Sequence, residues 1–149
     1  MGLLECASGA SLWRGYDYFE RGKVEQFGFI DNNRIAGTVA GGTTYSTLVD
    51  VAHPRKSSCN CPHADGKRIV CKHIVATYFA AFPEEAKKFY EEAMAYQEEE
   101  EQRQEEEEQR VIKYVHSLKK SELQQKLLEL LFEGPEWQYD RFIRDHVNW

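Results

Sequence analysis

Four residues in the middle of the chain have the types and the spacing of a metal site. Cys59 and Cys61 form a Cys-x-Cys pair, and Cys71 and His73 form a Cys-x-His pair after a loop of nine residues. Zinc in structural sites takes four thiolate or imidazole ligands in a tetrahedron. The polar loop between the pairs is flexible enough to fold back. We therefore expect both pairs to bind one Zn²⁺ ion.

A site with four protein ligands limits the chemistry that the metal can do. All positions of the tetrahedron are filled, so none remains for a water molecule, which argues against metal-assisted hydrolysis. Three thiolates and a neutral imidazole around Zn²⁺ carry a formal charge of about −1. Basic residues near the ligands in the sequence would offset this charge: Arg55, Lys56, Lys67, Arg68 and Lys72.

The other potential ligands have plainer interpretations. His63 lies in the loop between the two pairs and is interpreted as a surface histidine, with a substitute-ligand or outer-sphere role as the alternative. Cys6 is isolated near the N-terminus and is expected to be a free thiol. The chain has no Gly-rich phosphate loop, and its carboxylates crowd a segment where no pocket is expected. We therefore expect no enzymatic activity.

Composition bounds the class of protein. The chain has 149 residues, of which 42% are hydrophobic, which suffices for one ordinary domain or a small domain with an appendage. The N-terminus lacks the basic and apolar regions of a signal peptide, and no apolar run is long enough to cross a membrane. Three of the four cysteines fall within one short window, which favours metal over disulfides. The reducing cytoplasm is the expected compartment.

A helix is predicted ahead of the metal motif. Over residues 8–22, apolar side chains recur at helical spacing, with a serine at the start and Gly22 at the end. Gly15 lies inside this segment, where glycine costs about 1 kcal/mol relative to alanine. Either another element packs closely against Gly15, or the helix is irregular there.

A small sheet and a second helix are predicted around the motif. Three runs alternate between apolar and polar residues, 24–30, 34–39 and 44–51, and short turns join them. They predict a three-stranded antiparallel meander, which needs cover on one face. Residues 73–82 predict a core-facing helix that Pro83 ends. The predicted fold class is α+β, with a zinc-bound loop and helix and an α-helical tail.

The C-terminal part of the chain differs in charge. Residues 84–110 carry four basic and twelve acidic residues, whereas residues 1–83 have a net charge of +2 and residues 111–149 are neutral. Because its second half has no apolar face, we interpret 84–110 as a charged helical spacer; an acidic surface that repels nucleic acid or competes for a basic partner is the alternative. Leu-rich periodicity then predicts a helical tail over 111–149 that packs on itself, on the zinc-binding domain (1–83) or on a second chain.

The ligand spacing resembles that of the SWIM zinc finger, whose pattern is C-x-C-x(n)-C-x-H. The segment RGYDYFERGKV (14–24) and the strand-rich stretch after it are similar to the part that precedes the finger in bacterial SWIM proteins, and CKHIVATYFA (71–80) is similar to the family's ligand-bearing helix. The resemblance covers about residues 10–82, with a weaker similarity at 117–131. It implies a small stand-alone member of the family, whose finger binds DNA or protein. The ATPase motifs of larger members do not occur in the chain.

Two functions remain open at this point. The first is binding of nucleic acid, DNA in particular, through the basic residues near the finger. The alternative is a protein-interaction or oligomerisation adaptor that uses the helical tail and in which zinc is purely structural. A third possibility, that the chain is a subunit of a larger ATPase or nuclease assembly, is compatible with both functions. The sequence names neither the partner nor the oligomeric state.

Overall fold

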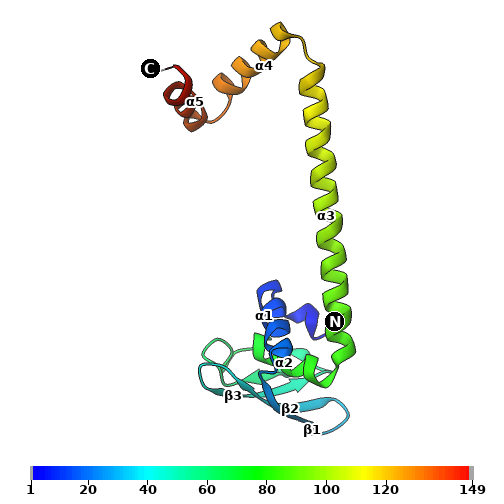
Figure 1. Ribbon diagram of the computed structural model, residues 1–149. Helices are drawn as coiled ribbons and strands as arrows, with labels where there is room; N and C mark the ends of the chain where they lie inside the picture. The colour runs from blue at the N-terminus through cyan, green and yellow to red at the C-terminus, as the bar shows by residue number, and fades with distance from the viewer. Residues whose placement is uncertain (1, 148–149) are drawn as a thin grey trace. The chain divides into compact units, whose positions relative to one another are not determined.

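The computed structural model describes residues 2–147 and has the predicted α+β fold (Figure 1). The chain divides into two compact units, and the boundary between them follows Met94. The first unit contains the sheet and the Cys/His motif, and the second contains only helices. None of the helices in the described part of the chain combines the length and the apolarity that crossing a membrane requires.

The first long helix, α1, spans Gly9–Glu20. The hydroxyl of Ser8 caps its start by accepting a hydrogen bond from the N–H of Ser11 at 3.2 Å. At its end, the N–H of Gly22 donates to the carbonyl of Phe19 at 3.0 Å. Gly22 has a φ of 64°, a left-handed conformation that glycine adopts without strain. The predicted helix and both of its predicted ends are therefore confirmed.

The sheet has four strands, one more than the sequence predicts. They are β1 (Val24–Phe29), β2 (Arg34–Ala40), β3 (Thr44–Asp50) and β4 (Ser58–Cys59), in that spatial order and all antiparallel to their neighbours. In β4, Cys59 pairs with Thr47 of β3. A strand of two residues is too short to show alternation, which is why sequence periodicity misses it.

Helix α2 (Lys72–Ala81) covers one face of the sheet and forms the centre of the first unit. It contacts β1, β2 and β3 on one side and α1 on the other (Figure 1). The side chains between these layers are fully buried: Ile35, Val39 and Val49 from the sheet, and Ile74, Val75 and Phe79 from α2. The helix predicted over residues 73–82 thus faces the core, as expected.

Two glycines allow α2 to approach its neighbours closely. A Cβ atom on Gly15 of α1 would lie 2.5 Å from the Cβ of Val75, so α1 packs closely against α2 at that point. A Cβ on Gly37 of β2 would lie 2.6 Å from the Cγ2 of Thr77. Beside this contact, the hydroxyls of Thr47 and Thr77 form a buried hydrogen bond of 2.7 Å. Close packing therefore explains Gly15, one of the two alternatives that the sequence left open.

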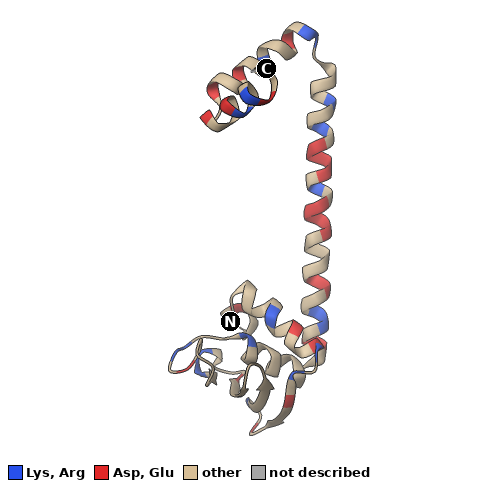
Figure 2. Ribbon diagram, turned by 60° about the vertical axis from the view of Figure 1, so that its left-hand side comes forward, with Lys and Arg blue, Asp and Glu red and all other residues tan. Residues whose placement is uncertain are grey.

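The remaining helices are α3 (Pro83–Ser117), α4 (Lys120–Glu133) and α5 (Glu136–Phe142), followed by a single π-helical turn, Ile143–Val147. Helix α3 begins at Pro83, shortly after the end of α2, and continues through the acidic run, whose Glu residues form red bands in Figure 2. Glu, Gln and Arg are strong helix formers. Bonds between successive turns, such as the one from Gln97 to Glu101 at 3.0 Å, support the helix without any apolar face.

The second unit has very little core of its own. Among its described residues, Leu131 is the one side chain that is buried. The exposed large apolar side chains of this unit are Tyr96, Val111, Ile112, Tyr114, Val115, Leu123, Leu127, Leu128, Leu130, Phe132, Trp137, Tyr139 and Val147. The predicted tail is therefore helical, but packing within the unit leaves most of its apolar side chains in contact with solvent.

Candidate metal centre

The four residues of the two pairs meet in the first unit. Their ligand atoms, three sulfurs and one imidazole nitrogen, all lie within 4.8 Å of one another. Cys59, Cys61, Cys71 and His73 are each at most 4% exposed. The loop of nine residues therefore folds back as the sequence predicts, and brings the two pairs to one point.

Short segments of regular structure position each pair. Cys59 lies on β4, which the ladder with β3 holds in place. The side-chain oxygen of Asn60 accepts a hydrogen bond from the N–H of Ser46 at 2.8 Å, which fixes the chain between the two cysteines. Cys71 is the N-cap of α2, and His73 is the second residue of that helix. The second pair is therefore held by a helix start, as expected.

The spacing of the ligand atoms fits a tetrahedral zinc ion. His73 Nδ1 lies 3.7 Å from the Sγ of Cys59 and 3.9 Å from the Sγ of Cys71. Ideal zinc bonds to sulfur and nitrogen at tetrahedral angles separate the two ligand atoms by about 3.5 Å. Only small movements would bring the four ligands to bonding distance. Cys59, Cys61, Cys71 and His73 would hold the ion, and the imidazole would bind through Nδ1.

The electrostatics of the cluster favour a cation. A hydrogen bond from the Cys59 thiol, together with His73 and the backbone N–H groups at the start of α2, lowers the pKa of Cys71 to about 4. The same bond, together with burial, raises the pKa of Cys59. One thiolate is thus already stabilised at neutral pH. A bound Zn²⁺ would replace the remaining thiol protons, because a metal ligates the thiolate form.

Aromatic rings surround the imidazole of His73. Tyr45 from β3 stacks on it with ring centroids 4.5 Å apart, and Tyr18 from α1 meets it edge-on at 5.4 Å. The Nε2 atom of His73 is buried and has no hydrogen-bond partner in the described structure. The rings therefore fix the orientation that hydrogen bonds usually give a ligating histidine. Sequence reasoning missed this contact; the inward position of Tyr45 on its predicted strand was the available signal.

Four of the five basic residues singled out from the sequence come together beside the centre. Arg55, Lys56, Lys67 and Arg68 line one open hollow, about 540 Å³ in volume, between β3, β4 and the loop that joins the two ligand pairs. All four are exposed, and none of them forms an ion pair with any described residue. We call this feature the basic hollow.

The fifth basic residue, Lys72, lies elsewhere. Its ammonium group lies 4.6 Å from the centre of the Tyr18 ring, a cation–π contact with α1. It lines a smaller hollow together with Arg14 and His63. His63 is exposed, and the ligand cluster does not include it. Cys6 is a free cysteine outside the cluster.

Comparison with known families agrees with this geometry. A family model described as SWIM zinc finger matches residues 42–82, the segment from the turn before β3 to the end of α2. No curated protein and no solved structure matches the chain. The matched segment contains all four ligands and the basic hollow. The predicted family and cofactor are thus confirmed: residues 42–82 of this chain are a SWIM zinc finger with a Cys₃His zinc site.

Proposed function

We propose that the zinc-finger unit binds nucleic acid through the basic hollow. The observation that carries this proposal is the convergence of four exposed cations without acidic partners on one concave surface. Asp65 is the one acidic residue lining the hollow, so the local charge is +3. Phosphate groups bind such clusters and release their counterions, which supplies most of the affinity of sequence-independent binding.

Zinc would act here by ordering the loop that carries the cations. Lys67 and Arg68 lie between the two ligand pairs, so a bound zinc ion would hold both ends of their segment. Gly66 has a φ of 68° in the turn just before them, a conformation suited to glycine. Because four protein side chains would fill the zinc tetrahedron, we assign the metal a structural role and the unit no catalytic one.

Fluorescence anisotropy with labelled duplex DNA tests this proposal. Single-stranded DNA and RNA of the same length serve as comparisons. The double variant Lys67→Ala/Arg68→Ala should weaken binding of zinc-loaded protein by about tenfold or more near physiological salt. The matched control, Lys87→Ala/Lys88→Ala, removes two exposed lysines of α3 that pair with Glu91 and Glu92 outside the hollow. It should bind like the wild type.

The salt dependence gives a second and stricter readout. Four phosphate contacts predict a slope of log K against log salt of about −3.6 for duplex DNA, and the double variant should reduce it to about −1.8. Equal losses in the double variant and in the control would show that only net charge matters. An unchanged slope in the double variant would refute binding at the basic hollow.

A second function, protein association through the tail, rests on a different observation. The described tail exposes a dozen large apolar side chains, and several of them line one groove; contiguous apolar surfaces on soluble proteins often mark interaction sites. We propose that this surface binds a protein. Replacing Leu127 and Leu130 by Asp should abolish association detected by light scattering, whereas Gln104→Asp on the exposed middle of α3 should not. Association unchanged by the leucine substitutions would refute this function.

A further inference from the structure

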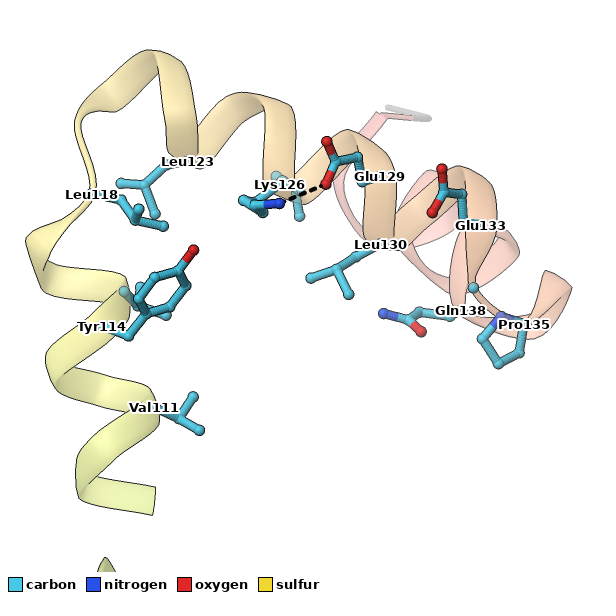
Figure 3. Close-up of a pocket in the computed structure, with 13 residues that line it drawn as sticks. Val111, Tyr114, Leu118, Leu123, Lys126, Glu129, Leu130, Glu133, Pro135 and Gln138 are labelled. Atoms are coloured by element: carbon cyan, nitrogen blue, oxygen red, sulfur yellow. Dashed lines mark hydrogen bonds and ion pairs between the residues drawn. The ribbon is translucent and has the colours of Figure 1, made fainter. Parts of the chain in front are cut away.

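The exposed apolar side chains of the tail form an open groove within the second unit. Val111 and Tyr114 from the end of α3, Leu118 just after it, and Leu123 and Leu130 from α4 face a shared space (Figure 3). The space has a volume of about 820 Å³. Leu130 is 60% exposed, although it points into the groove. We call this feature the tail groove.

The helices around the tail groove need an occupant. Leu131 is the only buried side chain among the described residues from 95 to 147. Short helices gain their stability from packing an apolar face, since propensity alone rarely offsets the conformational entropy that folding removes. An apolar surface from outside the described residues 95–147 must therefore complete the packing of these helices.

The charges of the tail indicate what that partner is. Residues 111–127 carry four basic residues and one acidic residue, a net charge of +3, whereas residues 128–140 carry four acidic residues and no basic one. Both segments line the groove, the first through Leu123 and the second through Leu130. A tail with one positive and one negative half is complementary to an identical tail running in the opposite direction.

We propose that a second copy of this chain fills the tail groove in an antiparallel, two-fold arrangement. This inference rests on the proposed protein association of the tail and names its partner. In such an isologous dimer, residues 111–127 of each copy face residues 128–140 of the other, so that both pairs of segments attract. A parallel dimer would instead set +3 against +3 and −4 against −4, and would bring the two acidic runs of 98–108 side by side.

Charge reversal in each half of the tail tests the arrangement. Variant A, K113E/K120E/K126E, changes the charge of residues 111–127 to −3; variant B, E129K/E133K/D140K, changes that of residues 128–140 to +2. In sedimentation equilibrium of the full zinc-loaded chain at low salt, A and B should each dimerise about tenfold or more weakly than the wild type. The chain that carries both sets should dimerise like the wild type, since its two halves attract again with reversed signs.

Controls separate the antiparallel dimer from nucleic-acid binding and from association of the tail with other proteins. Helicity by circular dichroism should be similar in all four chains when each is measured at a concentration where it is dimeric, and the differences in dimerisation should shrink at high salt because counterions screen exposed charges. A wild type that stays monomeric would overturn the second copy as partner and leave the groove to another protein or to the zinc-binding domain of the same chain. A dimer that the leucine substitutions break but neither A nor B weakens would overturn the antiparallel arrangement while tail association stands.

Discussion

Removal of one zinc ligand should destabilise the whole first unit. In the variant Cys59→Ser, a hydroxyl replaces a thiolate that belongs both to the ligand cluster and to the hydrophobic core around Ile74 and Phe79. The substitution also affects β4, which pairs with β3 at this residue. Because the same residue serves both zinc binding and core packing, loss of the metal should destabilise the whole unit and not only the ligand cluster.

The magnitude follows from comparing two free energies. Structural zinc binds finger peptides with an apparent free energy of about 10–16 kcal/mol, and this binding energy is also folding energy. Small domains are stable by about 5–15 kcal/mol in all. The metal-free first unit is therefore expected to be unfolded or close to its midpoint at 25 °C. Replacing one of four ligands should remove most of the zinc at micromolar protein and chelator.

Metal content and near-ultraviolet circular dichroism measure the two halves of this prediction. The first unit contains one aromatic cluster, formed by Trp13, Tyr16, Phe79 and Phe89. The near-ultraviolet signal of these packed rings reports folding of the first unit, whereas the far-ultraviolet signal also includes the helical tail. Cys6→Ser is the matched control, since Cys6 is a free cysteine outside the ligand cluster. One zinc per chain and an unchanged melting temperature in Cys59→Ser would refute the reasoning.

Two further substitutions test the packing around α2. Gly15→Ala should lower the free energy of unfolding of the unit by about 1–3 kcal/mol, because the new Cβ would overlap Val75. The control Gly9→Ala, at the open start of α1, should be neutral or stabilising by up to about 1 kcal/mol. Equal effects of the two variants in urea denaturation would contradict the close contact. Thr77→Val should cost about 1–2 kcal/mol, because it removes the hydroxyl that bonds Thr47 and the carbonyl of His73, while Thr44→Val at an exposed position should change thermal stability little. Similar melting temperatures for the two threonine variants would argue against the buried bond.

Local patterns predicted much of the first unit. Periodicity and end signals placed α1 between Ser8 and Gly22, because caps and glycine conformations are decided within a few residues. The metal ligands were predictable for the same reason, since a Cys-x-Cys and a Cys-x-His pair carry their chemistry in their spacing. Gly15 pointed either to a close contact or to an irregular helix, and the contacting residue, Val75, could not be named.

Features that depend on the path of a loop were not predictable. Strand β4 forms because the chain turns back along β3 after residues 51–57, and the fold of the loop between the ligand pairs brings Lys67 and Arg68 beside Arg55 and Lys56. Sequence proximity grouped Lys72 with these four residues, yet the start of α2 turns it toward Tyr18. The contact of Tyr45 with His73 likewise joins residues that only the folded sheet brings together.

Chelation of zinc should separate the two proposed functions. The four ligands and the basic hollow lie in the first unit, whereas the tail groove lies wholly in the second. Treatment with a chelator should therefore abolish DNA binding, because the loop that carries Lys67 and Arg68 loses both of its anchors. Dimerisation should persist within about threefold, since the interactions assigned to it involve only residues 111–140. Loss of the dimer together with the metal would show that the finger contributes to association and that the two units do not work independently.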